Sequence, residues 1–277
     1  MEIGIVGAGI TGLTAAYELG QAGHEVTIFE QAAQAGGLSG TFKDERWEWP
    51  LEKFYHHLFA SDHVVLNLSR ELGLGDKIFF PRPITAIWQN GTINAFDSAF
   101  AVLRYPYLPF VDKMRVGLVT LYLRLAKNWK PLERVTAHEW LPRYIGPRAY
   151  QMLWEPLLAN KFGQYYRQVN AAWFWARMHK RSPRLGYYAG GYQTLTDALL
   201  EKVQAQGSIV HLNAPVSRID GCAPRIRLYV GEEAHEFDVG IATVPPQAML
   251  RLAPTLPQNY LEQVRGLRSL GAMTLIL

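Results

Sequence analysis

Three glycines near the N-terminus restrict the fold of this chain more than any other feature. They are Gly7, Gly9 and Gly12, and they directly follow a short apolar run. In this GxGxxG spacing the first glycine permits a tight turn, the second lets the backbone approach a pyrophosphate, and the third lets a new helix pack closely on the strand. We therefore predict a strand, a turn and a helix, with the backbone N–H groups of Ile10 and Thr11 pointing at phosphates.

An acid follows at the distance that a dinucleotide-binding unit requires. A second predicted strand covers residues 24–30 and places Glu30 at its C-terminal end. A carboxylate there can accept hydrogen bonds from ribose hydroxyls and would repel a 2′-phosphate, which disfavours NADP. The structural alternative is a glycine-rich turn without a ligand, but strand, turn, helix, strand and acid in one unit argue against it. NAD and FAD both remain compatible with these residues.

A second glycine motif extends the pattern beyond the acid, through Gly36, Gly37 and Thr41. This segment resembles the extended fingerprint of the glutathione-reductase-type flavoproteins, in particular the monoamine oxidase, protoporphyrinogen oxidase and phytoene desaturase group. The resemblance implies FAD, and it implies hydride transfer to the flavin from a C–N or C–C bond of a fairly large apolar or aromatic substrate. Leu38 departs from the pattern, because the group usually has arginine there.

The resemblance continues in "WEPLLANKFG" and "GYYAGG", which are similar to protoporphyrinogen oxidase-like members. It also implies that a backbone group of Val216 pairs with the adenine ring. The cofactor-binding residues that it implies are Gly7, Gly9, Ile10, Thr11, Gly12, Glu30, Gln31, Gly36, Gly37, Leu38 and Val216. Two other kinds of protein resemble this pattern and remain alternatives. One is a flavin-dependent isomerase of the UDP-galactopyranose mutase type, and the other is a non-enzymatic binding protein like the GDP-dissociation inhibitors.

Catalytic residues are not identified by the sequence. Glu52, His56 and His57 follow the glycine pair and are polar candidates near the cofactor, with ordinary loop hydrogen bonds as the alternative for the histidines. Zinc binding by His56, His57 and His63 has little support, because adjacent histidines seldom point at one metal. We predict no metal site.

The order of patterns along the chain predicts an α/β fold with a Rossmann-like FAD-binding domain and a parallel sheet. An α+β substrate domain with a helical subdomain is inserted into it. Its markers are the hairpin signal Asn90-Gly91 and helical periodicity over residues 111–175. The predicted FAD-binding parts are residues 1–75 and 190–246, the predicted substrate domain is 76–189, and 247–277 begins a return to it. Because the chain ends in the apolar run "GAMTLIL", we expect it to be C-terminally truncated.

Aromatic residues crowd the predicted helical region. They could line a pocket for a large planar substrate, or they could form the core of the helical subdomain. They are Trp140, Tyr144, Tyr150, Trp154, Phe162, Tyr165, Tyr166, Trp173, Phe174 and Trp175.

The segment "VDKMRVGLVTLYLRLAKNWK" combines an apolar stripe with basic residues. The stripe consists of Val111, Met114, Leu118, Leu121, Leu125 and Trp129. The favoured interpretation is a helix that packs this stripe inward. The alternative is a helix that lies in a membrane interface, where basic groups meet anionic headgroups. The basic residues are Lys113, Arg115, Arg124, Lys127 and Lys130.

Composition limits the partners and the compartment. The net charge of +4 is small, and the Lys and Arg residues are spread along the chain instead of forming a basic run, so a nucleic-acid partner is not expected. Cys222 is the only cysteine, which excludes an internal disulfide. No apolar run reaches the roughly 20 residues of a membrane span, and the predicted first strand leaves no room for a signal peptide. We expect a cytoplasmic protein with a small-molecule substrate, and peripheral membrane contact as the alternative location.

Overall fold

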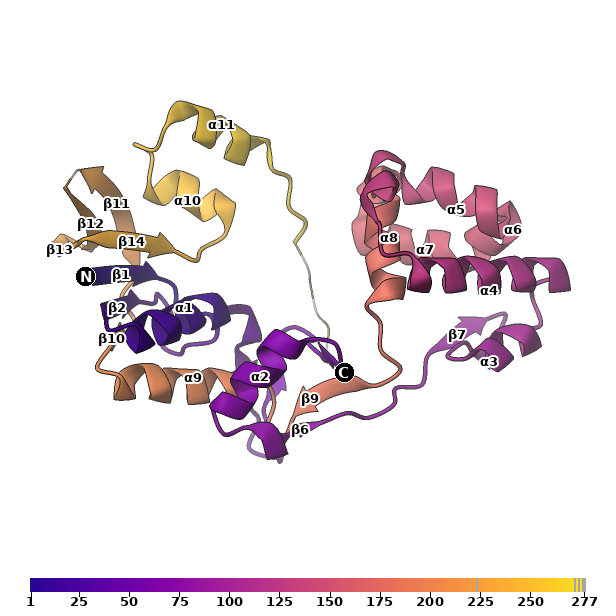
Figure 1. The fold of residues 1–277 in the computed structure, drawn as a ribbon, viewed down its shortest axis with the longest axis horizontal. Helices are drawn as coiled ribbons and strands as arrows, with labels where there is room; N and C mark the ends of the chain where they lie inside the picture. Colours follow the sequence, from indigo (N-terminus) through magenta and orange to yellow (C-terminus); the bar gives the residue numbers. More distant parts are fainter. Residues whose placement is uncertain (223, 272, 274, 276–277) are drawn as a thin grey trace. The chain divides into compact units, whose positions relative to one another are not determined.

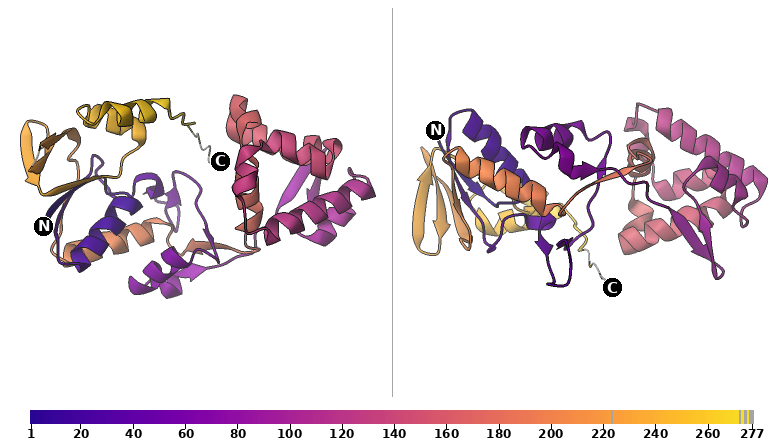
Figure 2. Two further views of the ribbon diagram at one scale, coloured as in Figure 1. Left: turned by 45° about the horizontal axis from the view of Figure 1, so that its top comes forward. Right: turned by 90° about the horizontal axis from the view of Figure 1, so that it is seen from below.

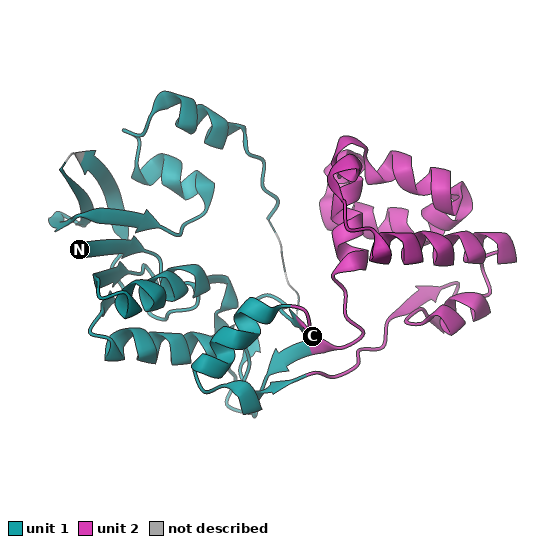
Figure 3. Cartoon of the chain, in the orientation of Figure 1, with its two compact units in different colours: residues 1–58, 62–79, 186–277 teal, residues 59–61, 80–185 magenta. Residues whose placement is uncertain are grey.

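The computed structural model describes residues 1–222, 224–271, 273 and 275. The chain forms two compact units (Figure 3). Unit 1 comprises residues 1–58, 62–79 and 186–277, and unit 2 comprises 59–61 and 80–185. Unit 2 is therefore inserted, in sequence, between the two main parts of unit 1.

A parallel sheet lies at the centre of unit 1, with strand order β10-β2-β1-β14 (Figure 1). β1 pairs in parallel with both β2 and β14, and β2 pairs in parallel with β10. The strands are β1 (Glu2–Val6), β2 (Glu25–Phe29), β10 (Ile209–His211) and β14 (Val239–Ala242). The predicted Rossmann-like fold with a parallel sheet is confirmed.

The two faces of this sheet have different covers (Figures 1 and 2). Helices α1 (Ile10–Gln21) and α9 (Gln193–Ala205) lie side by side against one face. The antiparallel sheet of β11 (Val216–Cys222), β12 (Arg225–Val230) and β13 (Glu233–Phe237) covers the other. Gly4 allows this close approach, because a Cβ there would stand 2.5 Å from the ring of Phe237.

Shorter elements complete this part of the chain. Of the apolar run at 271–277, the structure describes only residues 271, 273 and 275. The elements are η1 (Gly37–Ser39), β3 (Thr41–Phe42), β4 (Leu51–Glu52), β5 (Leu58–Phe59), α2 (His63–Glu71), η2 (Gly75–Lys77), β6 (Ile78–Phe79), β9 (Leu185–Tyr188), α10 (Pro246–Leu252) and α11 (Gln258–Gly266).

Unit 2 is a helical body with one hairpin. The hairpin is confirmed at Asn90 and Gly91, whose φ values of 50° and 77° are those of a type I′ turn. The predicted helical region is confirmed as a series of shorter helices. The elements are β7 (Ala86–Gln89), β8 (Thr92–Ala95), α3 (Ala99–Arg104), α4 (Phe110–Leu125), η3 (Lys130–Arg134), α5 (Ala137–Ile145), α6 (Pro147–Ala149), the π-helical turn η4 (Tyr150–Trp154), α7 (Glu155–Phe162), η5 (Gly163–Gln168) and α8 (Ala171–His179).

Most of the aromatic side chains build the core of unit 2. Tyr150, Phe174 and Trp175 are buried in it. Five others pack against it half-buried, namely Trp140, Trp154, Phe162, Tyr166 and Trp173. The core interpretation is confirmed for these eight residues, because helices that pack together bury aromatic surface whether or not a ligand is present.

The apolar stripe of α4 points away from the core, so the favoured inward packing was wrong. Leu118 and Leu125 keep 63% and 69% of their surface exposed, whereas Val116 and Leu123 are buried. Helix α4 therefore has two apolar faces. The stripe identified in the sequence is exposed, and the face that carries Val116 and Leu123 packs inward. Among the residues that the structure describes, no helix combines the length and the hydropathy that a membrane span requires.

Candidate cofactor-binding site

The turn between β1 and α1 is built so that only glycine fits at two positions. Gly7 has a φ of +105°, in the region that favours glycine. A Cβ on Gly12 would stand 1.9 Å from the carbonyl oxygen of Gly7, so a side chain there would push α1 away from the strand. The first of these glycines forms the turn, and the other sets the spacing between helix and strand.

The N-terminus of α1 is open to a ligand. Gly9 is the N-cap residue, and within the described part of the chain no side chain caps this end. The first N–H groups of a helix lack intrahelical acceptors, and the helix dipole makes this end partially positive. Ile10 is half-buried and Thr11 is exposed, so this first turn is accessible.

The second glycine motif lies against this turn. The Gly36 N–H donates to the Ala8 carbonyl at 2.9 Å, and Gly9 and Gly36 form an isolated parallel bridge. A Cβ on Gly37 would come 3.4 Å from the Cα of Gly9, and one on Gly9 would come 4.0 Å from the Cα of Gly37. Two backbones thus face each other without side chains, as a phosphate-binding cradle requires.

Glu30 is held at the same turn by the backbone. Its side chain is buried, with 8% of the residue exposed. Oε2 accepts the Ala8 N–H at 2.8 Å and Oε1 accepts the Ala32 N–H at 2.9 Å. A carboxylate offers about four acceptor positions, so these two bonds leave capacity for ribose hydroxyls.

The remaining predicted site residues lie at the margin of this turn. Gln31 is exposed, and Leu38 in η1 is 70% exposed. Val216 opens β11, two residues after Ala214, whose N–H donates to the Glu30 carbonyl at 2.8 Å. The structure therefore brings segments 7–12, 30–31, 36–38 and 214–216 together within unit 1.

Two further residues brace this site, and neither is among the cofactor-binding residues listed from the sequence. The Thr243 hydroxyl lies 3.0 Å from the Val6 carbonyl oxygen and 3.2 Å from that of Gly7. The Gln193 amide nitrogen donates to the Ala35 carbonyl at 3.2 Å. The sequence signal for Thr243 is an apolar strand that ends in threonine before a proline, which in the flavoproteins that the sequence resembles lies beside the dinucleotide. The only signal for Gln193 is its place shortly after a glycine pair.

The buried amide of Gln193 has one polar atom left over. Its nitrogen also donates to Asp197 Oδ1 at 2.7 Å. Its Oε1 is buried and finds no partner among the described residues, although Gly36 lies beside it. A buried acceptor without a donor is unfavourable, so a donor supplied by a ligand or a water would stabilise this position.

Glu52 and His56, two of the polar candidates from the sequence, form hydrogen bonds within the protein. Glu52 is buried and accepts the Tyr192 N–H at 2.8 Å and the hydroxyl of Tyr187. Burial, followed by the bond to Glu52, raises the pKa of Tyr187 above its ordinary value. His56 Nδ1 bonds the Phe54 carbonyl at 2.7 Å, which is an ordinary loop hydrogen bond.

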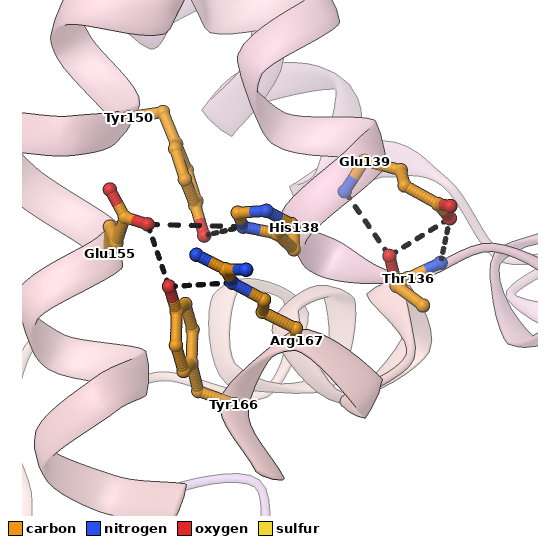
Figure 4. Close-up of polar contacts among 7 residues, drawn as sticks. All are labelled: Thr136, His138, Glu139, Tyr150, Glu155, Tyr166 and Arg167. Atoms are coloured by element: carbon orange, nitrogen blue, oxygen red, sulfur yellow. Dashed lines mark hydrogen bonds and ion pairs between the residues drawn. The ribbon is translucent and has the colours of Figure 1, made fainter. Parts of the chain in front are cut away.

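A second polar cluster lies within unit 2 (Figure 4). Tyr150 hydrogen-bonds His138 Nδ1 at 2.8 Å, Tyr166 donates to Glu155 Oε1 at 3.0 Å, and Arg167 Nε donates to the Tyr166 oxygen at 2.9 Å. Burial raises the pKa of Tyr150 to about 12. The cluster joins α5, η4, α7 and η5, and the sequence indicated only its aromatic rings. Among the described residues, no three potential metal-ligating side chains gather in one group.

Comparisons with known proteins agree with this geometry. Two L-amino-acid oxidases are similar to this chain in sequence. That of Gloydius halys is 25% identical, over 95% of this chain and 56% of its own length. That of Mus musculus is 41% identical, over 100% of this chain and 47% of its own length. The chain thus spans about half the length of these relatives. The crystal structure of an oxidoreductase from Methanosarcina mazei shares the fold, with a TM-score of 0.74, 18% identity, and coverage of 97% of this chain and 66% of that one. The family model of the flavin containing amine oxidoreductases matches residues 10–277. The chain therefore belongs to the family of flavin containing amine oxidoreductases.

Proposed function

We propose that this chain provides the dinucleotide-binding part of an FAD-dependent oxidoreductase that oxidises the C–N bond of an amine or amino acid. Membership of the family implies a flavin cofactor. The observation that carries the choice of FAD is the approach of Gly9 to Gly37 beside Glu30. Such a bare cradle next to a buried acid suits a pyrophosphate joined to a ribose.

Each part of the site has a distinct task in this proposal. The N–H groups at the start of α1 and the Gly36–Gly37 backbone would hold the pyrophosphate, since both lie at one turn. Glu30 would accept the ribose hydroxyls with the positions that Ala8 and Ala32 leave open. The backbone near Val216 would meet the adenine. FAD supplies the hydride-accepting chemistry when bound, and the protein binds and orients.

The substrate class rests on the comparisons. The family is one of amine oxidoreductases, and the L-amino-acid oxidases of Gloydius halys and Mus musculus are similar to this chain over nearly all of its length. These names favour C–N oxidation, and the similarity to the 15-cis-phytoene desaturase of Synechococcus elongatus, 24% identical over 99% of this chain, makes desaturation of a C–C bond the second candidate. The aromatic residues give no support for a planar substrate, because most of them form the core of unit 2.

Binding of three ligands to the 277-residue chain tests the cofactor. FAD is expected to bind, and FMN at least tenfold more weakly, because FMN lacks the adenosine that Glu30 and Val216 would contact. Gly9→Val is expected to abolish FAD binding by filling the cradle. Gly266→Val on α11 is the matched control, since a Cβ there meets nothing within 4 Å. Tighter binding of NAD than of FAD, or unchanged FAD affinity in folded Gly9→Val, would refute the cofactor assignment.

The substrate class needs its own measurement. L-amino acids and primary amines are added without oxygen to the FAD-loaded full-length protein that contains this chain, and the visible absorption of the flavin is followed. Bleaching by members of this panel is expected. A loaded protein that no amine bleaches, but that an unsaturated or polyene substrate does, would overturn the C–N assignment and leave the cofactor assignment intact.

A further inference from the structure

Helix α4 carries exposed apolar side chains along one entire face. We call this the outer α4 face, and its members recur every three or four residues, so they stand in one row. Their exposed fractions range from 42% for Met114 to 69% for Leu125. The members are Phe110, Val111, Met114, Leu118, Leu121 and Leu125.

The opposite face of α4 already packs on the core of unit 2. Val116 and Leu123 are 4% and 1% exposed and belong to that core. The outer α4 face is therefore not needed to fix the helix in place. Single exposed apolar side chains are normal on protein surfaces, but a contiguous row of six marks an interaction site.

Basic residues border this row on both sides. The helical period places Arg115 at one edge of the outer α4 face and Arg124 at the other. Lys127 and Lys130 follow the C-terminal end of the helix, and both are exposed. The single acid of α4, Asp112, is buried, with its Oδ1 at 3.8 Å from Arg115 Nη1. The exposed charges on α4 itself, and those between its C-terminal end and Lys130, are thus positive.

We propose that the outer α4 face lies in the interface of an anionic lipid membrane, which makes this a peripheral membrane protein. At 1.5 Å per residue the 16-residue helix is about 24 Å long, shorter than the roughly 30 Å hydrocarbon core, so it lies along the surface. The apolar row enters the boundary between headgroups and acyl chains, and the arginines and lysines reach lipid phosphates on either side.

A lipid surface fits these observations better than a protein partner does. A flat bilayer offers an apolar layer with negative charge on every side of the inserted row, which matches cations at both edges and beyond the helix end. A second copy of this chain would instead bring the same cations against each other, which is unfavourable in an isologous interface. The proposal is independent of flavin binding, because every residue involved belongs to unit 2.

Vesicle co-sedimentation of the full chain tests this proposal. The probes are vesicles of pure phosphatidylcholine and vesicles of equal parts phosphatidylcholine and phosphatidylglycerol, at low and high salt. Binding to the anionic vesicles is expected, weakened by salt. The triple variant R124Q/K127Q/K130Q is expected to bind about 100-fold more weakly, from about fivefold per cation. Leu118→Ser combined with Leu121→Ser is expected to lose at least about tenfold through reduced apolar insertion.

Matched variants in unit 1 control for general effects of charge and hydrophobicity. They are Lys202→Gln with Arg251→Gln and Arg265→Gln, all three exposed, and Val64→Ser on α2 with Ile209→Ser on β10, where the residues are 86% and 56% exposed. These variants are expected to bind as the original chain does. Far-UV circular dichroism verifies that all variants fold, which is expected because every altered side chain is exposed.

Three outcomes would overturn the proposal. The first is no binding of the original chain to anionic vesicles at low salt. The second is equal binding by R124Q/K127Q/K130Q and by its control in unit 1. The third is self-association of the chain in sedimentation velocity that Leu118→Ser with Leu121→Ser abolishes, without vesicle binding; this face would then be an interface between copies.

Discussion

Two single substitutions, Gly12→Ala and Gly9→Ala, should show that one glycine of the β1–α1 turn serves the stability of the fold and the other serves cofactor binding. At Gly12 an added Cβ would stand 1.9 Å from the Gly7 carbonyl oxygen and 3.0 Å from Thr243 Oγ1. The helix must move by more than about 1 Å to relieve the first contact, and overpacking of this kind typically costs about 1–3 kcal/mol. We expect Gly12→Ala to lower the free energy of unfolding by that amount.

At Gly9 the same change should have the opposite effect on stability. The added Cβ meets no atom closer than 4.0 Å, and the φ of −74° and ψ of 175° suit alanine. The loss of glycine's freedom in the unfolded chain then stabilises by about 0.4–1 kcal/mol. Binding of FAD should nevertheless fall at least tenfold, because the methyl group occupies the side of the turn where the pyrophosphate would lie.

Scanning calorimetry and FAD titration of the two variants measure both effects. For a unit of this size, each kcal/mol shifts the melting temperature by about 2–4 °C. Gly12→Ala should therefore melt several degrees below the original chain and Gly9→Ala at or slightly above it. Equal melting temperatures for the two variants would refute the claim that Gly12 sets the spacing of helix and strand. Unchanged FAD affinity in Gly9→Ala would refute the role of Gly9.

Three further predictions concern single interactions. Thr243→Val removes the hydroxyl beside the Val6 and Gly7 carbonyls and should cost about 1 kcal/mol in urea unfolding, whereas Thr243→Ser should retain most of the stability. Thr136→Ala removes a capping box with Glu139 at the start of α5 and should also cost about 1 kcal/mol; no change in the unfolding midpoint would contradict the cap. Tyr150 has its pKa raised from 10.0 to about 12, so the stability from its neutral form is complete below pH 10 and is lost as pH rises to about 12. Unfolding of Tyr150→Phe should depend less steeply on pH across that window, and an identical slope would contradict the burial effect.

The fold of unit 1 was accessible to sequence because its signals are local. Gly7, Gly9, Gly12 and Glu30 all lie within one βαβ unit, where spacing alone determines which backbone groups meet. The hairpin at Asn90 was predictable for the same reason, because two adjacent residues specify the turn.

The contacts that sequence missed join distant segments. The partners of Glu52 lie more than 130 positions along the chain, at Tyr187 and Tyr192, and no periodicity reports such pairs. The orientation of α4 was misjudged for a different reason: it has apolar residues on two faces, and periodicity does not say which face meets the core.

The strand order of the central sheet has a consequence for synthesis of the chain. β1 lies between β2, which follows it closely, and β14, whose first residue pairs with Ile3 across 236 positions. Until residue 239 has emerged from the ribosome, β1 presents an unpaired edge, and for most of that time the backbone of Gly4 lacks the ring of Phe237 that packs against it. Edges of this kind pair readily with other chains, and pairing of remote strands is slow. The N-terminal segment of the nascent chain therefore remains an incomplete sheet during the whole translation of unit 2. At this stage of synthesis a chaperone would protect the largest exposed strand edge.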